Sequence, residues 1–156
     1  MGLELVGAPQ ELWRFGTQER VQRGTPLMLF AVFAANAVAV GYSTPRLQGA
    51  AAGYSVTAGR TLILTRVLLR TSLVSKPFGV GYSDSDRGMD NAADGANPVN
   101  LDTITAAGEG VITMAVLDTP ADFSTYYEIP AGKFPRLVTP VTAAAAYFVQ
   151  LFGHEV

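Results

Sequence analysis

Short apolar segments separated by turn residues recur along the chain, and no long stretch has the apolar spacing of an amphipathic helix. Segments rich in β-branched, leucine and aromatic residues and bounded by Gly, Pro, Asn, Asp or Ser are typical of β-strands. The candidate strand segments are 27–40, 61–74, 78–82, 111–117, 123–129, 134–138 and 145–151. Because the first of these is long enough for a bent pair of strands, the sequence predicts an all-β protein of about eight strands, an antiparallel β-sandwich or a barrel.

Two of these segments carry more specific expectations. Leu27–Val40 is apolar at nearly every position, but it is shorter than the roughly 20 residues that a membrane-spanning helix needs. We expect it to be a strand buried on both faces, in a protein that does not cross a membrane. Phe134–Val138 contains Pro135, and a proline favours an edge position in a sheet.

One short motif occurs twice. Tyr54-Ser55-Val56-Thr57-Ala58-Gly59-Arg60 reappears as Tyr127-Glu128-Ile129-Pro130-Ala131-Gly132-Lys133, and each copy leads into an apolar segment. Glycine adopts positive φ without steric cost, so each copy predicts an extended stretch followed by a tight turn. We expect two equivalent corners, one at the start of each half of a sandwich, with Arg60 and Lys133 directed to solvent or to a neighbouring subunit.

Composition favours one domain that associates with other chains. The 156 residues are 49% hydrophobic and only 15% charged, which leaves little charge to cover the surface of a monomer. A compact monomer with a surface rich in Ser, Thr, Ala and Gly is the alternative. The net charge is −2 and the basic residues are scattered, so no nucleic-acid-binding surface is predicted.

Residues 1–26 differ from the rest of the chain and are expected to form an extended N-terminal arm, followed by a β-sandwich domain over 27–156. The arm holds the cluster Leu12, Trp13, Arg14 and Phe15, which includes the single tryptophan. Trp and Arg are enriched at interface hot spots, so we expect these four residues to bind a partner subunit. Folding of Trp13 onto the core of its own chain is an equally good interpretation.

The doubled corner and the closing segment Ala145–Glu155 together resemble small jelly-roll structural proteins of tailed bacteriophages. The resemblance covers roughly residues 54–72 and 123–156. It implies a jelly-roll-like sandwich, a homotrimer, a location in the virion and no enzymatic activity. The partner that it implies is the major capsid protein or another virion protein.

Two functions fit this resemblance. The first is a capsid decoration or stabilising subunit that binds a repetitive lattice as an oligomer. The alternative is a tail or fibre adhesin module that binds cell-surface glycans through aromatic rings such as those of Tyr42, Tyr82 and Tyr126.

Metal and catalytic chemistry have weaker candidates. Asp84, Asp86, Asp90 and Asp94 lie close together in the sequence and supply oxygen ligands of the kind Ca²⁺ prefers, but their spacing departs from the EF-hand pattern. The chain has no cysteine, a single histidine (His154) and no Gly-x-Ser-x-Gly motif. A carboxylate pair made by Glu128 with Asp118 or Asp122 is conceivable. We expect no cofactor and no catalysis.

Overall fold

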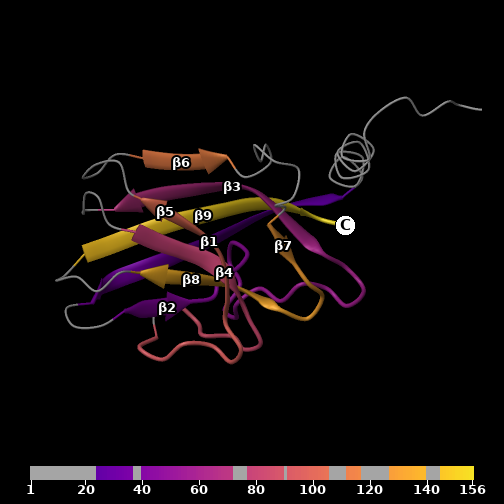
Figure 1. The fold of residues 1–156 in the computed structure, drawn as a ribbon, viewed down its shortest axis with the longest axis horizontal. Helices are drawn as coiled ribbons and strands as arrows, with labels where there is room; N and C mark the ends of the chain where they lie inside the picture. Colours follow the sequence, from indigo (N-terminus) through magenta and orange to yellow (C-terminus); the bar gives the residue numbers. More distant parts are fainter. Residues whose placement is uncertain are drawn as a thin grey trace, which may run out of the picture.

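The structure is a computed structural model that describes residues 24–36, 40–71, 77–89, 91–105, 112–116, 127–139 and 145–156. Within these ranges the protein is all-β, and two antiparallel sheets pack face to face as a sandwich (Figure 1). No helix in this part of the chain is long and apolar enough to cross a membrane. Residues 1–23, most of the expected arm, lie outside the described residues, and the first strand begins at Thr25.

Nine strands make up the two sheets. They are β1 (Thr25–Asn36), β2 (Gly41–Ser43), β3 (Leu62–Thr71), β4 (Pro77–Ser83), β5 (Val99–Thr105), β6 (Ile112–Val116), β7 (Glu128–Ile129), β8 (Phe134–Thr139) and β9 (Ala145–Glu155). One sheet has the order β1-β9-β3-β6, and the two-residue β7 also pairs with β3. The other sheet has the order β2-β8-β4-β5.

The pairing is nested, which makes the sandwich a jelly roll. β1 pairs with β9, β2 with β8, β3 with β6 and β4 with β5, all antiparallel. The chain is therefore equivalent to one long hairpin with its tip between β4 and β5. Rolling that hairpin up adds two further pairings, β3 with β9 and β4 with β8, and divides the strands between the two sheets of a jelly roll.

The core lies between the sheets because alternate residues of each strand point inward. Phe78 of β4 and Tyr147 of β9 meet there from opposite sheets, with ring centroids 5.8 Å apart. The other core residues are Leu29, Ala31, Val56, Leu62, Leu64, Val67, Leu69, Val80, Ile104, Ile129, Leu137, Val149 and Leu151. All of them are apolar, so hydrophobic burial holds the two sheets together.

The two copies of the doubled motif form two equivalent turns. In each turn the fourth residue donates its backbone N–H to the first carbonyl, from Arg60 to Thr57 (3.0 Å) and from Lys133 to Pro130 (3.2 Å). Gly59 and Gly132 occupy the third position with φ of 75° and 73°, as a type II turn requires. The prediction of two equivalent corners is therefore confirmed, but Lys133, expected to face solvent or a neighbouring subunit, forms an ion pair with Asp84 of the same chain.

The corners also bind each other and lead into different sheets. Val56 donates its N–H to the carbonyl of Lys133 (3.0 Å), and Gly132 donates its N–H to the carbonyl of Val56 (2.9 Å). The first corner precedes β3 and the second precedes β8, so their mutual bonds connect the starts of strands in opposite sheets. Val56 and the matching Ile129 are both buried in the core below the turns.

Two expectations about strands were wrong. β5 was not predicted, because a bulge places Leu101 as an extra residue opposite the Val80–Gly81 step and breaks the alternation of apolar residues. β8 was expected at an edge but pairs with both β2 and β4. Pro135 fits there because β2 pairs only from Leu137 onward, so β4 is its one strand neighbour.

We predict that Gly59→Ala and Gly132→Ala each lower the free energy of unfolding by about 1–2 kcal/mol, the cost of a left-handed backbone for a residue with Cβ. A Cβ at either position would meet no atom within 4 Å, so backbone strain alone is tested. Chemical denaturation measures the change. Gly59→Asn and Gly132→Asn are the controls and should cost less, since Asn tolerates positive φ. Equal losses for Ala and Asn would contradict the turn assignment.

Candidate functional site

The outward side of the β1-β9-β3 part of the first sheet carries a continuous set of apolar and arginine side chains. The register aligns them in three rows, Met28–Phe152–Arg66, Phe30–Gln150–Leu68 and Val32–Phe148–Arg70, which together we call the outer face. Gln150 Nε2 contacts Met28 Sδ at 3.6 Å, which confirms that neighbouring rows share this side of the sheet. Val116, Met114 and Ile112 of β6 hold the matching register positions.

The outer face leaves large hydrophobic side chains uncovered. Met28, Val32 and Phe148 are 39%, 44% and 36% exposed, whereas Leu29 and Ala31, the alternate residues of β1, are 1% and 0% exposed. Burial of β1 on both faces was expected from its apolar sequence. Among the residues of β1 whose burial is described, only those on the inner side are fully buried, so the expectation holds for one face and is wrong for the other in the single chain.

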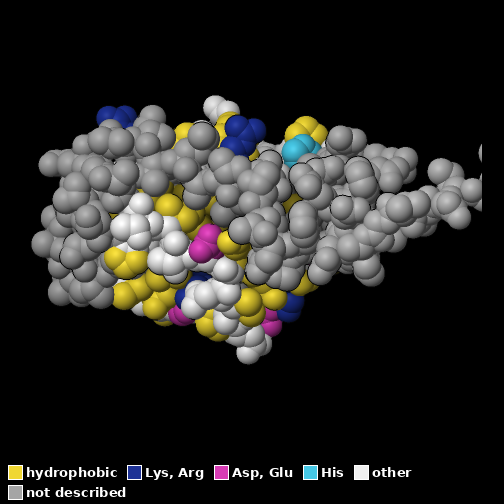
Figure 2. All heavy atoms as spheres, turned by 45° about the horizontal axis from the view of Figure 1, so that its top comes forward, with side chains coloured by type: hydrophobic (Ala, Val, Ile, Leu, Met, Phe, Trp, Pro, Cys, Tyr) yellow, Lys and Arg dark blue, Asp and Glu magenta, His cyan; other side chains and the backbone are white. Residues whose placement is uncertain are grey.

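Two arginines flank the aromatic rings of the outer face. The Arg66 guanidinium lies 5.9 Å from the centre of the Phe152 ring, and Arg70 stands opposite Phe148 in the register and is exposed. A third base, Arg46, lies 5.6 Å from the ring of Phe30. The three rows contain no acidic residue. Figure 2 shows one side of the molecule, on which hydrophobic (yellow), basic (dark blue), acidic (magenta) and other (white) side chains reach the surface between the grey residues.

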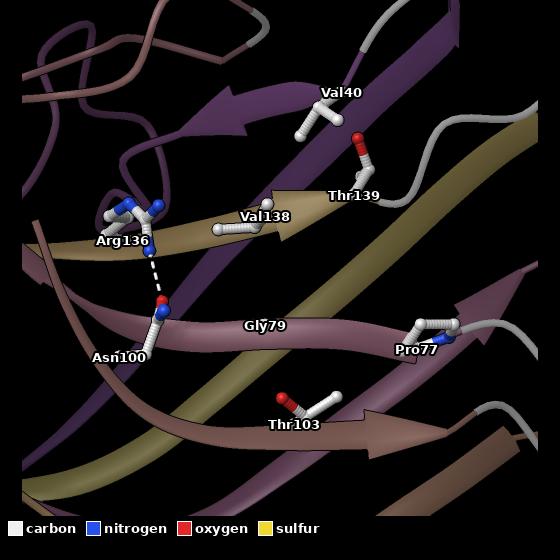
Figure 3. Close-up of a pocket in the computed structure, with 8 residues that line it drawn as sticks. All are labelled: Val40, Pro77, Gly79, Asn100, Thr103, Arg136, Val138 and Thr139. Carbon is white, nitrogen blue, oxygen red and sulfur yellow. Dashed lines mark hydrogen bonds between the residues drawn. The ribbon is translucent and has the colours of Figure 1, made fainter.

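The second sheet has a shallow cavity of about 270 Å³ on its outward side (Figure 3). Val138, Gly79 and Thr103 lie in one row across β8, β4 and β5, and the glycine leaves the centre of that row without a side chain. The remaining lining residues are Val40, Pro77, Asn100, Arg136 and Thr139.

Arg136, at one end of the cavity, is fully engaged by the protein itself. Its guanidinium donates two hydrogen bonds to Asp94, at 2.6 and 2.5 Å, and one to Asn100 Oδ1 at 2.6 Å. It also lies 5.4 Å from the centre of the Tyr42 ring. Arg136 is only 5% exposed, so these contacts supply a buried charge with a carboxylate partner.

The loop between β4 and β5 carries the carboxylates proposed for calcium, and the described ones bind protein groups. Asp84 accepts hydrogen bonds from Lys133 and Asn97, Asp86 accepts from the backbone of Gly53 and Gly88, and Asp94 binds Arg136. In the described ranges no three metal-ligating side chains come together. Asp90 lies outside the described residues.

These contacts also set the charge state of the loop. Hydrogen bonds from Asn97 and Lys133 lower the pKa of Asp84. Burial by itself would raise the pKa of Asp94, but the hydrogen bonds from Arg136 and from the Gly95 backbone outweigh it and lower the pKa. Lysine and arginine of the same chain therefore supply the positive charge next to these two carboxylates.

Glu155 of β9 fastens the first corner. Its carboxylate accepts hydrogen bonds from the Tyr54 hydroxyl (2.6 Å), the Thr57 N–H (2.6 Å) and the Thr57 hydroxyl (3.0 Å). Burial raises the pKa of Glu155, but these bonds and the charge of Arg60 outweigh it, so the pKa lies below its ordinary value. In the second copy of the motif the Tyr127 hydroxyl instead donates to Asp102 at 2.9 Å.

The other residues selected from the sequence are placed as follows. The ring of Tyr42 lies next to Arg136, and Tyr82 packs against the core; both tyrosines are partly exposed. His154 and Glu128 pair with Ile63 from opposite sides in the register, and His154 Nδ1 has no hydrogen-bond partner in the part of the chain that is described. Leu12, Trp13, Arg14, Phe15, Asp118, Asp122 and Tyr126 lie outside the described residues.

The outer face was missed by sequence reasoning, although a signal was present. Apolar residues on both alternations of β1 indicate two faces that need cover. The same is visible in β9, where Phe148 and Phe152 alternate with Val149 and Leu151. Sorting the residues of these two segments by the face of the strand on which they lie, and adding Arg66 and Arg70, would have identified most of the outer face from the sequence.

Comparison with known proteins adds no family. No protein-family model matches the sequence, and no curated protein matches it with significance. One solved structure that the fold search returned is the crystal structure of the T13 IBDV viral particle, with 12% identity and a TM-score of 0.16. The match covers 83% of this chain and 37% of that one, and its TM-score is too low to carry an argument.

We predict that Asp94→Asn lowers the free energy of unfolding by about 1–3 kcal/mol, because it leaves the buried Arg136 without its full set of charged acceptors. Asp84→Asn is the matched control. The pair that Asp84 forms with Lys133 is exposed on both sides, so its loss should change stability little. Chemical denaturation of the two variants tests this, and equal losses would contradict a special role for the buried pair.

We predict that Glu155→Gln lowers the free energy of unfolding by about 1.5–3 kcal/mol at neutral pH, because charge-assisted hydrogen bonds to the corner are lost. The pKa of Glu155 is lower in the folded state than in the unfolded state. Its contribution to the free energy of unfolding is therefore complete above about pH 4.5 and is lost as the pH falls through the folded-state pKa. The stability difference between wild type and variant should therefore shrink in acid. A difference independent of pH would contradict the assignment, and Tyr54→Phe should remove only part of the effect.

Proposed function

We propose that this chain is a non-enzymatic structural subunit of a virion, a capsid decoration protein that associates with copies of itself and binds a repetitive lattice. The observation that carries the proposal is the uncovered outer face, with Met28, Val32 and Phe148 each more than a third exposed. These residues form part of three adjacent rows, and clustered apolar surface of this kind marks an interaction site.

The energetics favour a repeated contact over a single weak one. Full burial of an aliphatic or aromatic side chain contributes about 1.5–3 kcal/mol, and the outer face offers several such groups. Met28, Val32 and Phe148 are already more than half buried, so covering each adds only part of that amount. Association has to offset a cost of roughly 4–15 kcal/mol in lost motion and therefore needs contacts from many groups at once. A homotrimer repeats the same contact three times and remains our proposal for the oligomer.

The fold and the composition agree with this role. Jelly rolls occur in viral capsid proteins, and also in lectins and cupins, so the fold alone does not choose the function. The resemblance of the two corners and of the closing strand to tailed-bacteriophage structural proteins favours the viral use. The low charged fraction of 15% fits a chain whose surface is largely covered by neighbours.

We predict that the wild-type chain sediments as an oligomer, and that Val32→Lys and Phe148→Lys each weaken self-association by at least about tenfold, equivalent to 1.4 kcal/mol. Both side chains are exposed in the single chain, so the lysine variants should fold normally. Thr103→Lys, on the outward side of the other sheet, is the control and should leave association unchanged. Sedimentation velocity over a concentration series gives the subunit number.

Binding to the lattice is measured separately, by co-sedimentation of the chain with capsids assembled from the major capsid protein of the same genome. Deletion of residues 1–20 is expected to abolish this binding. A wild-type chain that stays monomeric at all concentrations and does not bind these capsids would reject the proposed function.

A further inference from the structure

The charge of the outer face restricts what can cover it. Its three rows contain Arg66 and Arg70 and no acidic residue. The two ion pairs formed among the described residues are Lys133–Asp84 and Arg136–Asp94, so neither outer-face arginine is paired within that part of the chain. Face-to-face packing of two identical copies with β3 over β3 would bring these arginines together, and like charges in an interface are unfavourable, whereas packing of β3 over β1 would leave them without an acidic partner. The complementary partner is apolar and acidic.

The chain contains a segment with that chemistry outside the described residues. Residues 1–13 combine six large apolar residues, Met1, Leu3, Leu5, Val6, Leu12 and Trp13, with Glu4 and Glu11, and include no lysine or arginine. The next ten positions, 14–23, carry Arg14, Arg20 and Arg23 and one acid, Glu19. The charges of this segment are therefore separated into an acidic, apolar first part and a basic second part.

Chain length allows residues 1–13 to reach the outer face, and charge favours a neighbouring copy over the same copy. Trp13 precedes Gly24 by 11 residues, which span up to about 36 Å when extended. Gly24 immediately precedes Thr25, which pairs with Glu155 at one end of the sheet, and the Arg66 row is the first row of the outer face from that end. A segment folded back onto its own sheet would bring Arg20 and Arg23 towards Arg66, which like-charge repulsion opposes.

We propose that residues 1–13 of one copy bind the outer face of a neighbouring copy, with Leu12 and Trp13 against Val32 and Phe148 and with Glu11 beside Arg70. The proposal rests on the oligomeric function proposed above and names the partner of its interface. The basic residues 14–23 then form the connection between subunits. Each subunit gives one segment and receives another, an arrangement that closes into a ring such as the proposed trimer.

Because the chain has no cysteine, introduced cysteines test the contact cleanly. Full-length Gln10→Cys and Gln150→Cys chains are refolded together and oxidised. Gln150 is at the centre of the outer face, opposite Phe30 and Leu68, and we expect a disulfide between the two different chains. A mixture of Gln10→Cys with Thr103→Cys is the control and should give little product. Cross-linking confined to a single chain that carries both substitutions would overturn the assignment to a neighbour.

Trp13 supplies a second, independent measurement, since it is the only tryptophan. In the full-length oligomer its fluorescence should be shifted to shorter wavelength than in denaturant. Arg70→Glu should move the emission to longer wavelength, and Glu11→Arg in the same chain should restore it by exchanging the charges. Emission that is the same in wild type, single and double variants would reject the contact.

The results separate this inference from the proposed function. An oligomer that Val32→Lys weakens, but that gives no cross-link to Gln150→Cys and no change at Trp13, overturns the binding of residues 1–13 and leaves the proposed function intact. A wild-type chain that is monomeric at all concentrations and does not bind capsids overturns both. Cross-linking between chains together with charge-exchange rescue supports both.

Discussion

The structure depends on the pairing of β9 with both β1 and β3. This pairing fixes the first and last described strands side by side, and every other pair nests inside it. β9 also supplies Val149 and Leu151 to the core and Glu155 to the first corner, so one strand determines sheet order, packing and the position of a turn. Through the bonds between the two corners, the effect of Glu155 extends to the start of β8 in the opposite sheet.

The local structure could largely be predicted from the sequence, but the pairing could not. Phe78, Val80 and Tyr82 alternate with glycine and form β4 as expected, and the two Ala-Gly turns follow from the need for positive φ. β5 was missed because its bulge separates the two residues that face the core, Leu101 and Ile104, by three positions instead of two. Which strands become neighbours depends on long-range contacts that alternation in a single segment does not encode.

The outer face likewise could not be predicted from alternation within single segments, because it depends on which strands become neighbours. The apolar residues of β1 indicate that both faces of this strand bind other residues. The chemistry of the partner on the outer face, however, depends on which residues of the neighbouring strands lie in each row. The contribution of Arg66 and Arg70 became visible only once the register placed them opposite Phe152 and Phe148. The carboxylates of the β4–β5 loop are the opposite case, because a sequence cluster was predicted as one site and its described members bind separate protein partners.

Charge is scarce in this chain, and the way it is used connects these observations. Asp84, Asp94 and Glu155 each bind a specific donor, and the first two are paired with Lys133 and Arg136. The chain has few charges, and most of the described acids bind groups of the same chain. Solubility alone therefore does not explain two arginines among exposed aromatic rings. Burying an arginine is costly without an acidic partner, so a partner that covered Arg66 and Arg70 would be favoured if it supplied carboxylates. This preference, more than apolar area, is the reason for proposing an acidic and apolar segment as the partner.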